Sequence, residues 1–430
     1  MTAHLSRRSL LGVAGASAGT LLLGACSDDK TADPNGAQTI NWWHIQNTDP
    51  MLPVWAAIAK EYETAHSNVK VAIQPLENEA FKAKLTTATQ AGSPPDLFQS
   101  WGGGVLQQQV DAGLVKDITA DVQPWIGSLL PAALQPFTID NKIYGVPFDV
   151  GMVGFWYNKE LFTKAGITAP PTTWAELLTV VGKIKAAGII PIALAGKEKW
   201  PGHFYWAYLS MRIGGLGALQ QAAKDHNFDT PDFVAAGTRF KELIDLAPFQ
   251  KGFLGAEYGS PDGQAATMGN GGAAMELMGQ WAPSVQASSS TSKKGLGDKL
   301  GFFPFPAVEG GKGTVAEAFG GGNGFVVGKN APAATLDFLK TLLTAANQRK
   351  SAATGAVLPT VKDAADAIAD ANSKVVAASL AAATGFQLYL DQAYPPAVGQ
   401  QVNDSVAELV AGSKKPEQIV VDITKTAKSQ

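Results

Sequence analysis

Four groups of aromatic side chains stand beside glycine, histidine or amide residues, and they offer the clearest chemistry in this sequence. The ten tryptophans all lie at or before Trp281 in a chain of 430 residues. The groups cover residues 42–44, 99–104, 200–206 and 279–281. A ring in such a context is often exposed at the edge of a loop, where it can stack on the flat apolar face of a sugar. Any single ring could equally be a core residue, but four such groups together favour a carbohydrate site.

A sugar site also needs carboxylate, amide or imidazole side chains that bond the hydroxyl groups. Residues of this kind near the aromatic groups are Gln46, Asn47, Glu77, Asn78, Asp149, His203, Asn323 and Asp391. Each of them could instead be solvated or cap a helix, as Asn78 could for a helix over residues 78–90.

Other chemistries find little support in the sequence. The formal net charge is −3 and no run of lysine and arginine exceeds two residues, which argues against nucleic-acid binding. The five histidines are scattered, and there is no metalloprotease motif and no phosphate-binding loop. A Gly-x-Ser-x-Gly pattern at residues 15–19 lies in the N-terminal leader rather than between a strand and a helix. The sequence therefore suggests no metal, no cofactor and no enzyme active site.

The N-terminus has the layout of a secretory signal over residues 1–25. Arg7 and Arg8 precede an apolar run over residues 10–23, and Leu-Gly-Ala leads to Cys26, the single cysteine of the chain. The paired arginines resemble a twin-arginine export signal, and the Leu-Gly-Ala-Cys ending resembles a lipobox. We expect lipidation of Cys26, a flexible tether over residues 26–38 and attachment to the outer face of the cell membrane. The alternative is an unlipidated signal with an incidental cysteine.

After the tether, strands and helices alternate in a way that predicts an α/β fold. Strands are expected at 39–45, 69–74 and 96–99, separated by helices at 52–66, 78–90 and 104–112, which implies a parallel sheet. A hairpin is expected at residues 138–146, across Asp140 and Asn141. A second block begins near residue 148, and its expected strands lie at 153–157, 189–193, 273–278 and 300–305. A helix is expected at 173–187, and it opens with a capping box formed by Thr173 and Glu176. A glycine-rich crossing is expected at 317–327. Four helices are expected to follow at 332–347, 361–383, 396–411 and 416–428.

Four stretches of the sequence form distinctive motifs. They are Trp42-Trp43-His44; Pro95-Asp96-Leu97-Phe98 with Trp101-Gly102-Gly103; Ile143-Tyr144-Gly145-Val146-Pro147-Phe148-Asp149 leading to Trp156-Tyr157-Asn158-Lys159-Glu160-Leu161-Phe162; and Gly272-Ala273-Ala274-Met275 running to Gly279-Gln280-Trp281-Ala282. On these motifs the chain resembles the extracellular sugar-binding proteins that include the maltose-binding proteins. The resemblance covers about residues 39–425.

The resemblance implies a periplasmic-binding-protein-like fold: two α/β lobes joined by hinge crossovers, with the ligand in the cleft between them. Lobe one would comprise residues 39–147 and 318–362, and lobe two residues 148–317 and 363–430. By position, Trp281, Trp101, His203 and Phe204 fall where the family places cleft side chains, Asp149 falls at the hinge, and Asp391 falls near a more loosely matched ring position. With the polar candidates, the expected ligand-binding set is Trp43, His44, Glu77, Asn78, Trp101, Asp149, His203, Phe204, Trp281, Gly321, Asn323 and Asp391.

The function implied by the resemblance is capture of an oligosaccharide, with xylobiose or a related xylo-oligosaccharide as the first expectation. The protein would be a monomer, would not be an enzyme, and would deliver the sugar to the membrane permease of an ATP-driven importer. Two alternatives stay open at this point: a secreted glycoside hydrolase, which needs a pair of carboxylates across a cleft, and an importer protein for a non-sugar solute.

Overall fold

Three parallel strands form one side of the larger, six-stranded sheet. The computed structural model describes residues 36–430, and the expected secretion signal, the lipidation site and most of the tether lie outside this range. Strand β1 (Gln38–His44) pairs in parallel with β2 (Val69–Pro75) on one side and with β3 (Leu97–Ser100) on the other. This pairing confirms the predicted parallel sheet, and we call the part of the molecule built around it lobe one.

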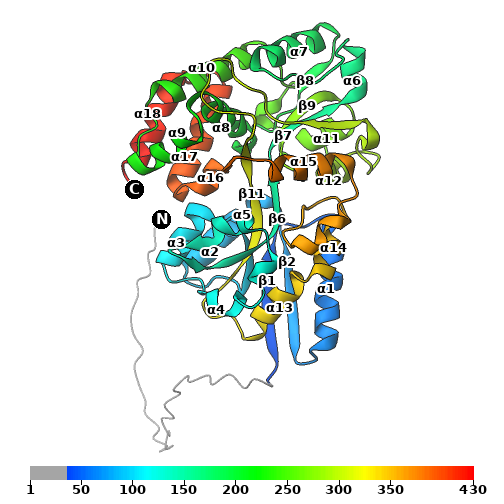
Figure 1. Cartoon of the computed structure of the whole chain (residues 1–430), viewed down its shortest axis with the longest axis vertical. Coiled ribbons are helices and arrows are strands. Elements are labelled where there is room, and N and C mark those ends of the chain that lie inside the picture. Colours follow the sequence, from blue (N-terminus) through cyan, green and yellow to red (C-terminus); the bar gives the residue numbers. More distant parts are fainter. Residues whose placement is uncertain (1–35) are drawn as a thin grey trace, which may run out of the picture. The chain divides into compact units, whose positions relative to one another are not determined.

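Lobe one carries its helices on both faces of this sheet (Figure 1). Its remaining elements are α1 (Met51–Ala65), α2 (Asn78–Gln90), α3 (Gly103–Asp111), α4 (Thr119–Val122), η1 (Ile126–Ser128), α5 (Pro131–Leu134), η2 (Gln135–Phe137), β4 (Thr138–Ile139), β5 (Lys142–Ile143), α13 (Ala334–Leu342), α14 (Ala345–Ala352) and η5 (Lys362–Ala367). Strands β4 and β5 form the predicted hairpin, and Asp140 and Asn141 both have positive φ angles at its turn.

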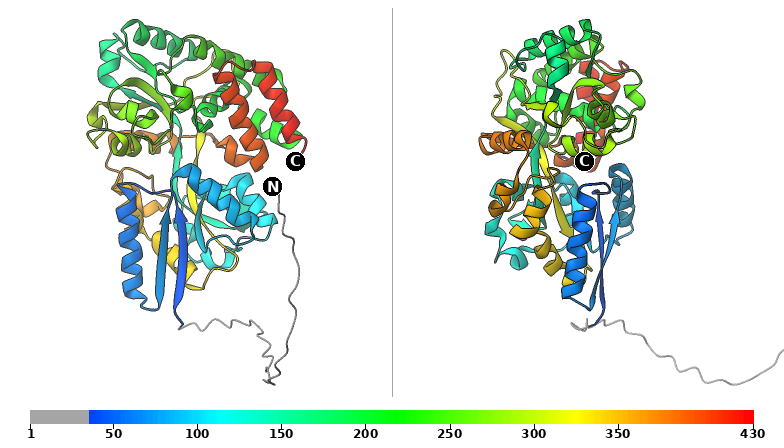
Figure 2. Two further views of the ribbon diagram at one scale, coloured as in Figure 1. Left: turned by 180° about the vertical axis from the view of Figure 1, so that it is seen from behind. Right: turned by 90° about the vertical axis from the view of Figure 1, so that its right-hand side faces the viewer.

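A second, four-stranded sheet in the order β10-β7-β9-β8 is the centre of what we call lobe two. Its C-terminal helices α17 and α18 pack on each other and on α8 and α10, and they are seen from behind in Figure 2. The elements of lobe two are β7 (Gly154–Asn158), α6 (Lys159–Lys164), α7 (Trp174–Ala186), β8 (Ile190–Ile192), α8 (Trp200–Gly214), α9 (Leu216–Asp225), α10 (Pro231–Asp245), η3 (Phe253–Gly255), α11 (Gln264–Gly269), β9 (Ala273–Met278), α12 (Ala282–Ser289), η4 (Gly297–Lys299), β10 (Leu300–Phe303), α15 (Ala371–Ala381), β12 (Gly385–Leu388), α16 (Leu390–Ala393), α17 (Pro396–Val410) and α18 (Pro416–Ala427).

Two long strands, β6 (Gly145–Met152) and β11 (Glu317–Val327), run from one lobe into the other as an antiparallel pair (Figure 1). On β6, Phe148 belongs to the core of lobe one and Met152 to the core of lobe two. On β11, Phe319 belongs to the core of lobe two and Phe325 to that of lobe one. The short stretches between these anchors are therefore shared by both lobes, and a bulge interrupts the pairing between Asn323 and Gly324.

The structure corrects several expectations drawn from the sequence. Residues 200–206 do not form an exposed loop edge; they open helix α8, and residues 201–212 of that helix are all buried. The expected helix at 332–347 is divided into α13 and α14 because Thr344 caps a new helix, its hydroxyl accepting from the Asn347 N–H. The expected helix at 361–383 is divided into η5 and α15, and Asp370 caps α15 in the same way. The capping box of Thr173 and Glu176 is present as predicted.

Phe325 tests how far the fold depends on the aromatic core of lobe one. Its ring is fully buried and lies 4.6 Å from Phe148, 5.4 Å from Trp42 and 5.3 Å from Trp55, measured between ring centroids. Removing a buried phenylalanine ring loses burial and leaves a cavity, so Phe325→Ala is expected to lower the free energy of unfolding by about 3–5 kcal/mol. Urea unfolding followed by fluorescence measures the change. The exposed Val421 on α18 is the control, and a loss below about 1 kcal/mol in Phe325→Ala would contradict the prediction.

Candidate functional site

A hydrogen-bonded cluster centred on Asp149 ties the two crossing strands to lobe two. Asp149 lies on β6 opposite Asn323 of β11 and is almost completely buried. Its Oδ2 accepts from Asn323 Nδ2 at 2.8 Å and from Gln280 Nε2 at 2.7 Å. Gln280 immediately precedes Trp281 in the turn after β9. The cluster therefore fixes the base of the Trp281 turn to both crossing strands.

The same cluster reaches lobe one and the segment around Leu358. Asn323 Oδ1 accepts from Gln99 Nε2 at 2.9 Å, and Gln99 Oε1 accepts from the Ile45 N–H at 3.2 Å. On the other side, Asp149 Oδ1 accepts from the Leu358 N–H at 2.8 Å. Four chain segments far apart in sequence thus share one carboxylate. This carboxylate is occupied by protein donors, which makes Asp149 and Asn323 hinge-fixing residues in this structure.

Burial is the main influence on the charge of Asp149. It raises the pKa of this carboxyl from 3.8 to about 6, against the opposing effect of the donors on Leu358, Asn323 and Gln280. The group is therefore close to titration near neutral pH although it is hydrogen-bonded on both oxygens.

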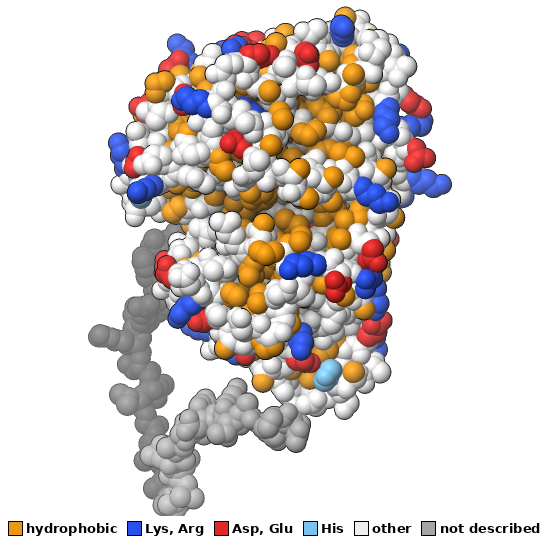
Figure 3. All heavy atoms as spheres, in the orientation of Figure 1, with side chains coloured by type: hydrophobic (Ala, Val, Ile, Leu, Met, Phe, Trp, Pro, Cys, Tyr) orange, Lys and Arg blue, Asp and Glu red, His pale blue; other side chains and the backbone are white. Residues whose placement is uncertain are grey.

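Aromatic rings line the side of lobe two that is next to these strands. Trp200 lies 5.5 Å from Phe204 and 5.4 Å from Tyr258, Phe204 stacks on Tyr389 at 5.5 Å, and Trp281 lies 6.1 Å from Tyr389, all between ring centroids. We call these five residues the aromatic wall. Two of the predicted site residues, Phe204 and Trp281, both contact Tyr389 in the wall, which adds three rings to the predicted set. In the space-filling view, apolar side chains are concentrated where the two lobes meet (Figure 3).

Tyr389 of the aromatic wall lies directly on the hinge strand. A Cβ atom at Gly321 would come within 2.3 Å of the Tyr389 ring. Only glycine allows this close approach, which explains the structural requirement for Gly321. In this structure Gly321 supports the wall rather than contributing a side chain to it.

Polar atoms along the aromatic wall lack partners although they are buried. Trp200 Nε1, the Tyr389 hydroxyl, Glu198 Oε2 and His203 Nε2 all have this property. Buried polar atoms in native proteins are normally hydrogen-bonded, and an unpaired one costs about 1–3 kcal/mol. A row of such atoms beside stacked rings is the arrangement expected of a surface that a polar ligand completes.

His203 shows which hydrogen-bonding role this surface offers. It is fully buried, and its Nδ1 lies 2.8 Å from Asn403 Oδ1, so Nδ1 carries the proton that it donates. Nε2 is then an acceptor without a donor. Burial lowers the pKa of His203, which favours the neutral ring, and the positive charge of Lys82 lowers it further, whereas Asp391 and Asn403 act in the opposite direction.

Helix α2 and the Trp101 loop of lobe one face this part of lobe two. Lys82 on α2 lies over the Trp101 ring at 5.7 Å, pairs with Glu79 at 3.2 Å, and is near enough to influence His203. Glu77 and Glu79, at the N-terminus of α2, are near enough to raise the pKa of Glu198 in lobe two. The structure therefore brings the start of α2, with Lys82 over the Trp101 ring, near Glu198 and His203 of lobe two.

Backbone also meets backbone across the lobes beside Trp101. A Cβ atom at Gly104, in the first turn of α3, would come within 2.4 Å of the Tyr394 carbonyl group in lobe two. Helix α3 therefore rests on the chain around α16, and glycine is what permits the contact.

The remaining predicted site residues lie elsewhere or act differently. His44 is completely buried in the core of lobe one, 4.7 Å from both Trp42 and Trp55, and burial lowers its pKa to about 3. The Trp43 ring lies 4.4 Å under the Lys84 amine on the outside of α2. Glu77 rather than Asn78 caps α2, accepting from the Glu79 and Ala80 N–H groups. Neither His44 nor Trp43 is brought to the aromatic wall.

Glu198, Tyr258 and Gln280 are site residues that sequence reasoning missed. Glu198 precedes Trp200 by two positions and could have been found from that spacing. Tyr258 follows Glu257 in a loop with no aromatic neighbour, so its sequence context carried no signal. Gln280 stands within the predicted Gly-Gln-Trp group, but nothing in the sequence distinguishes a hinge-bonding amide from a ligand-bonding one.

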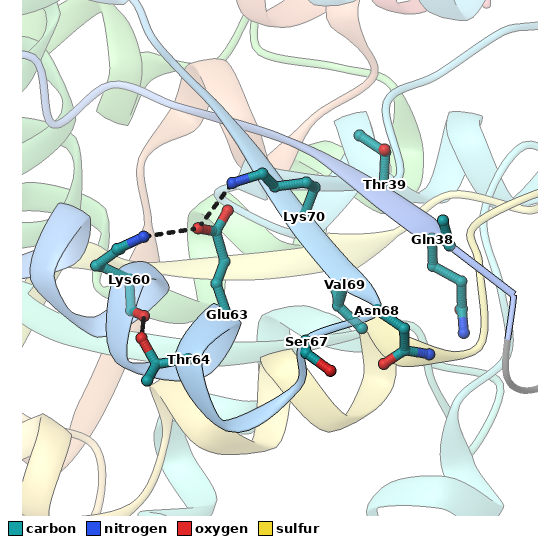
Figure 4. A pocket seen from close by; sticks show the side chains of 10 residues that line it. Gln38, Thr39, Lys60, Glu63, Thr64, Ser67, Asn68, Val69 and Lys70 are labelled. Carbon is teal, nitrogen blue, oxygen red and sulfur yellow. Dashed lines mark hydrogen bonds and ion pairs between the residues drawn. The ribbon is translucent and has the colours of Figure 1, made fainter.

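Depressions elsewhere on the surface do not involve the aromatic wall. One lies at the outer end of β1 and α1, where Lys60 and Lys70 both reach the Glu63 carboxylate, at 3.8 and 3.3 Å (Figure 4). Another is lined by His226, Tyr394 and the C-terminal residue Gln430. Neither depression is lined by a predicted site residue.

Two further properties concern only the part of the chain that the structure describes. Within residues 36–430, no three histidine, cysteine, aspartate or glutamate side chains are grouped so that they could hold a metal ion. No helix in the same range has the length and apolar character needed to cross a bilayer.

The fold and the site together define a class: binding proteins in which two α/β lobes face each other across paired hinge strands. Residues 46–349 match the bacterial extracellular solute-binding proteins, and the chain belongs to this family.

Three relatives show the extent of the similarity. An uncharacterized ABC transporter extracellular-binding protein of Pyrococcus horikoshii is 28% identical over 60% of this chain and 58% of its own length. A solved structure from a study of xylan utilization by Caldanaerobius polysaccharolyticus has 28% identity and a TM-score of 0.83, covering 90% of this chain and 99% of that one. A chitin oligosaccharide binding protein has 27% identity and a TM-score of 0.83, covering 91% and 98%.

The buried carboxylate of Asp149 predicts a specific pH dependence of stability. Because its pKa is raised on folding, its contribution is complete below about pH 4 and is lost as the pH rises through about 6. A rise from 3.8 to about 6 corresponds to roughly 3 kcal/mol. Between these pH values, the free energy of unfolding of the wild type is expected to fall relative to that of Asp149→Asn.

Chemical denaturation at a series of pH values measures this difference. Asp245→Asn is the control, because Asp245 is an exposed carboxylate that pairs with Lys241 on the same helix. A constant stability difference between the wild type and Asp149→Asn across the range would contradict the prediction.

Proposed function

We propose that this protein is the extracytoplasmic sugar-binding component of an ABC importer, and that it captures an oligosaccharide between its lobes. The observation that carries the proposal is the row of unpartnered buried polar atoms along the aromatic wall, which suits a ligand with flat apolar faces and many hydroxyl groups. Membership of the solute-binding family and the similarity to a xylan-utilization protein and a chitin oligosaccharide binding protein support it.

In this proposal Trp281, Phe204 and Trp101 stack on the sugar rings, and His203 Nε2 and Asp391 accept hydrogen bonds from hydroxyl groups. Asp149, Asn323 and Gly321 act through the hinge strands, and Glu77 and Asn78 border the site at the start of α2. Xylobiose or a related xylo-oligosaccharide remains the first expectation for the ligand.

Binding and lobe closure are coupled in the proposed mechanism. The sugar first meets the aromatic wall of lobe two, and lobe one then closes over it about β6 and β11. The sugar shifts this equilibrium only by its higher affinity for the closed form. The closed form then presents both lobes to the permease. Lobe boundaries near residues 147, 318 and 362, a lipid anchor at Cys26 and a monomeric state complete the proposal.

Trp281→Ala tests the stacking role. The ligand of the wild type is first identified by thermal shift and calorimetry with xylobiose, xylotriose, cellobiose, maltose and N,N′-diacetylchitobiose. A ligand present at a hundred times its dissociation constant raises the free energy of unfolding by about 2.7 kcal/mol, which thermal shift detects. Loss of a central stacking ring is expected to weaken binding about 30-fold or more.

Trp125→Ala is the matched control, because this half-buried ring packs on the core of lobe one away from the aromatic wall. If no saccharide stabilises the wild type, the sugar proposal fails and a non-sugar solute takes its place. If an oligosaccharide is cleaved during incubation, the protein is a hydrolase.

Gly104→Ala tests closure separately from sugar contact. The added Cβ meets the Tyr394 carbonyl only when the lobes touch, so the variant is expected to bind sugar about 10-fold more weakly and to show a smaller decrease in radius of gyration on saturation. Small-angle scattering with and without sugar measures the decrease. Gly182→Ala in α7 is the control, because its Cβ would meet nothing within 4 Å. An unchanged radius of gyration in the saturated wild type would disprove closure.

A further inference from the structure

One carboxylate oxygen of Glu198 accepts a hydrogen bond from the protein, and the other has no hydrogen-bond partner. Glu198 lies in the loop between β8 and α8. Its Oε1 accepts from the Tyr258 N–H at 3.2 Å, whereas Oε2 is buried and has no partner. A carboxylate oxygen that is removed from water without a hydrogen-bond donor costs free energy. A donor from outside the protein would therefore stabilise Glu198 Oε2.

Two aromatic residues with buried polar groups lie near this carboxylate. The Trp200 and Tyr258 rings are 5.4 Å apart, the Trp200 Nε1–H is buried without a partner, and the buried Tyr258 hydroxyl has the Trp281 indole as its hydrogen-bonding neighbour. Tyr258 is more than nine-tenths buried. The three residues thus offer a carboxylate acceptor, an indole donor and a hydroxyl that does either. A sugar hydroxyl donates one hydrogen bond and accepts another, so it matches this set.

The charges around Glu198 decide what kind of ligand group can enter. Glu77 and Glu79 face it from α2, and Glu257 lies beside it. The nearby lysines are occupied: Lys197 pairs with Glu257, Lys199 with Asp404 and Lys82 with Glu79. This negative environment opposes phosphate, carboxylate and other acceptor groups and favours groups that donate.

We propose that Glu198 is a specificity-determining residue whose Oε2 accepts a hydrogen bond from a saccharide hydroxyl, in a subsite completed by Trp200 and Tyr258. The subsite selects a group that donates a hydrogen bond, such as a sugar hydroxyl, over a group that only accepts, such as a phosphate or a carboxylate. This inference rests on the proposed sugar-binding function and names a residue and a selectivity within it.

The subsite also couples sugar binding to a proton. Burial raises the pKa of Glu198 to about 7; the Tyr258 N–H opposes the rise, and the charges of Glu79, Glu77 and Glu257 add to it. A hydroxyl that donates to the carboxylate stabilises its charged form and lowers this pKa. Binding near pH 7 therefore releases a proton, and affinity rises as the pH increases through about 7. The other charged or titratable groups near the site are His203, Asp391, Asp404, Lys82 and Lys199.

Calorimetry on the full chain with xylobiose, or with the tightest unacetylated oligosaccharide of the panel, tests the inference. At pH 8, Glu198→Gln is expected to bind about 10- to 100-fold more weakly, and its affinity no longer increases between pH 6 and pH 8. Tyr258→Phe is expected to lose several-fold in affinity while keeping the pH dependence. Glu160→Gln is the matched control, because Glu160 pairs with Lys299 on the surface of lobe two.

Proton release by the wild type, measured in buffers of different ionisation enthalpy, tests the same inference without any variant. If the wild type binds sugar but releases no proton, or if Glu198→Gln keeps the wild-type affinity and pH profile, the inference is overturned and the proposed function stands. If the saccharide binds more tightly at low pH than at high pH, Glu198 acts as a protonated donor and the proposed selectivity is wrong. If no saccharide binds the wild type, the proposed function fails and this inference fails with it.

Discussion

The shared carboxylate of Asp149 is the constraint on which the rest of the architecture depends. Two strands cross between the lobes, and a pair of strands alone would leave the lobes free to twist about each other. Asp149 receives hydrogen bonds from β11, from the Trp281 turn and from the segment at Leu358. One buried group thereby joins the two crossing strands to the Leu358 segment and to the turn that carries Trp281.

This arrangement explains why the hinge strands are rich in small residues. The strands must carry hydrogen bonds to each other and also accept large side chains from lobe two against their backbone. Tyr389 lies on Gly321, and the Gln280 amide packs on Gly151. The hinge is therefore an antiparallel pair of strands, interrupted by one bulge, and the aromatic wall packs on its surface. Motion of the strands would therefore also move the rings.

The charges around the site divide into two kinds with different physical origins. Asp149 is buried among protein donors, and its charge serves the hinge. Glu198 Oε2 and His203 Nε2 are buried without partners, and the charges of Glu79, Glu77 and Lys82 in lobe one reach these two residues. Glu198 and Tyr258, which meet in this region, are 60 positions apart in the sequence.

The sequence by itself determined the alternation of strands and helices, the parallel sheet of lobe one, the hairpin at Asp140 and Asn141, and the region of Trp281, because each depends on local periodicity, turn chemistry or a distinctive motif. Tertiary structure decided which polar residues serve the site. His44 follows the second of two adjacent tryptophans and looked exposed, but strand alternation turns it into the core. Residues 200–206 looked like a loop but form a buried helix, because packing against α10 and α17 outweighs their glycine and proline content. Burial and the partners available to a side chain are set by distant segments, and a local pattern cannot encode them.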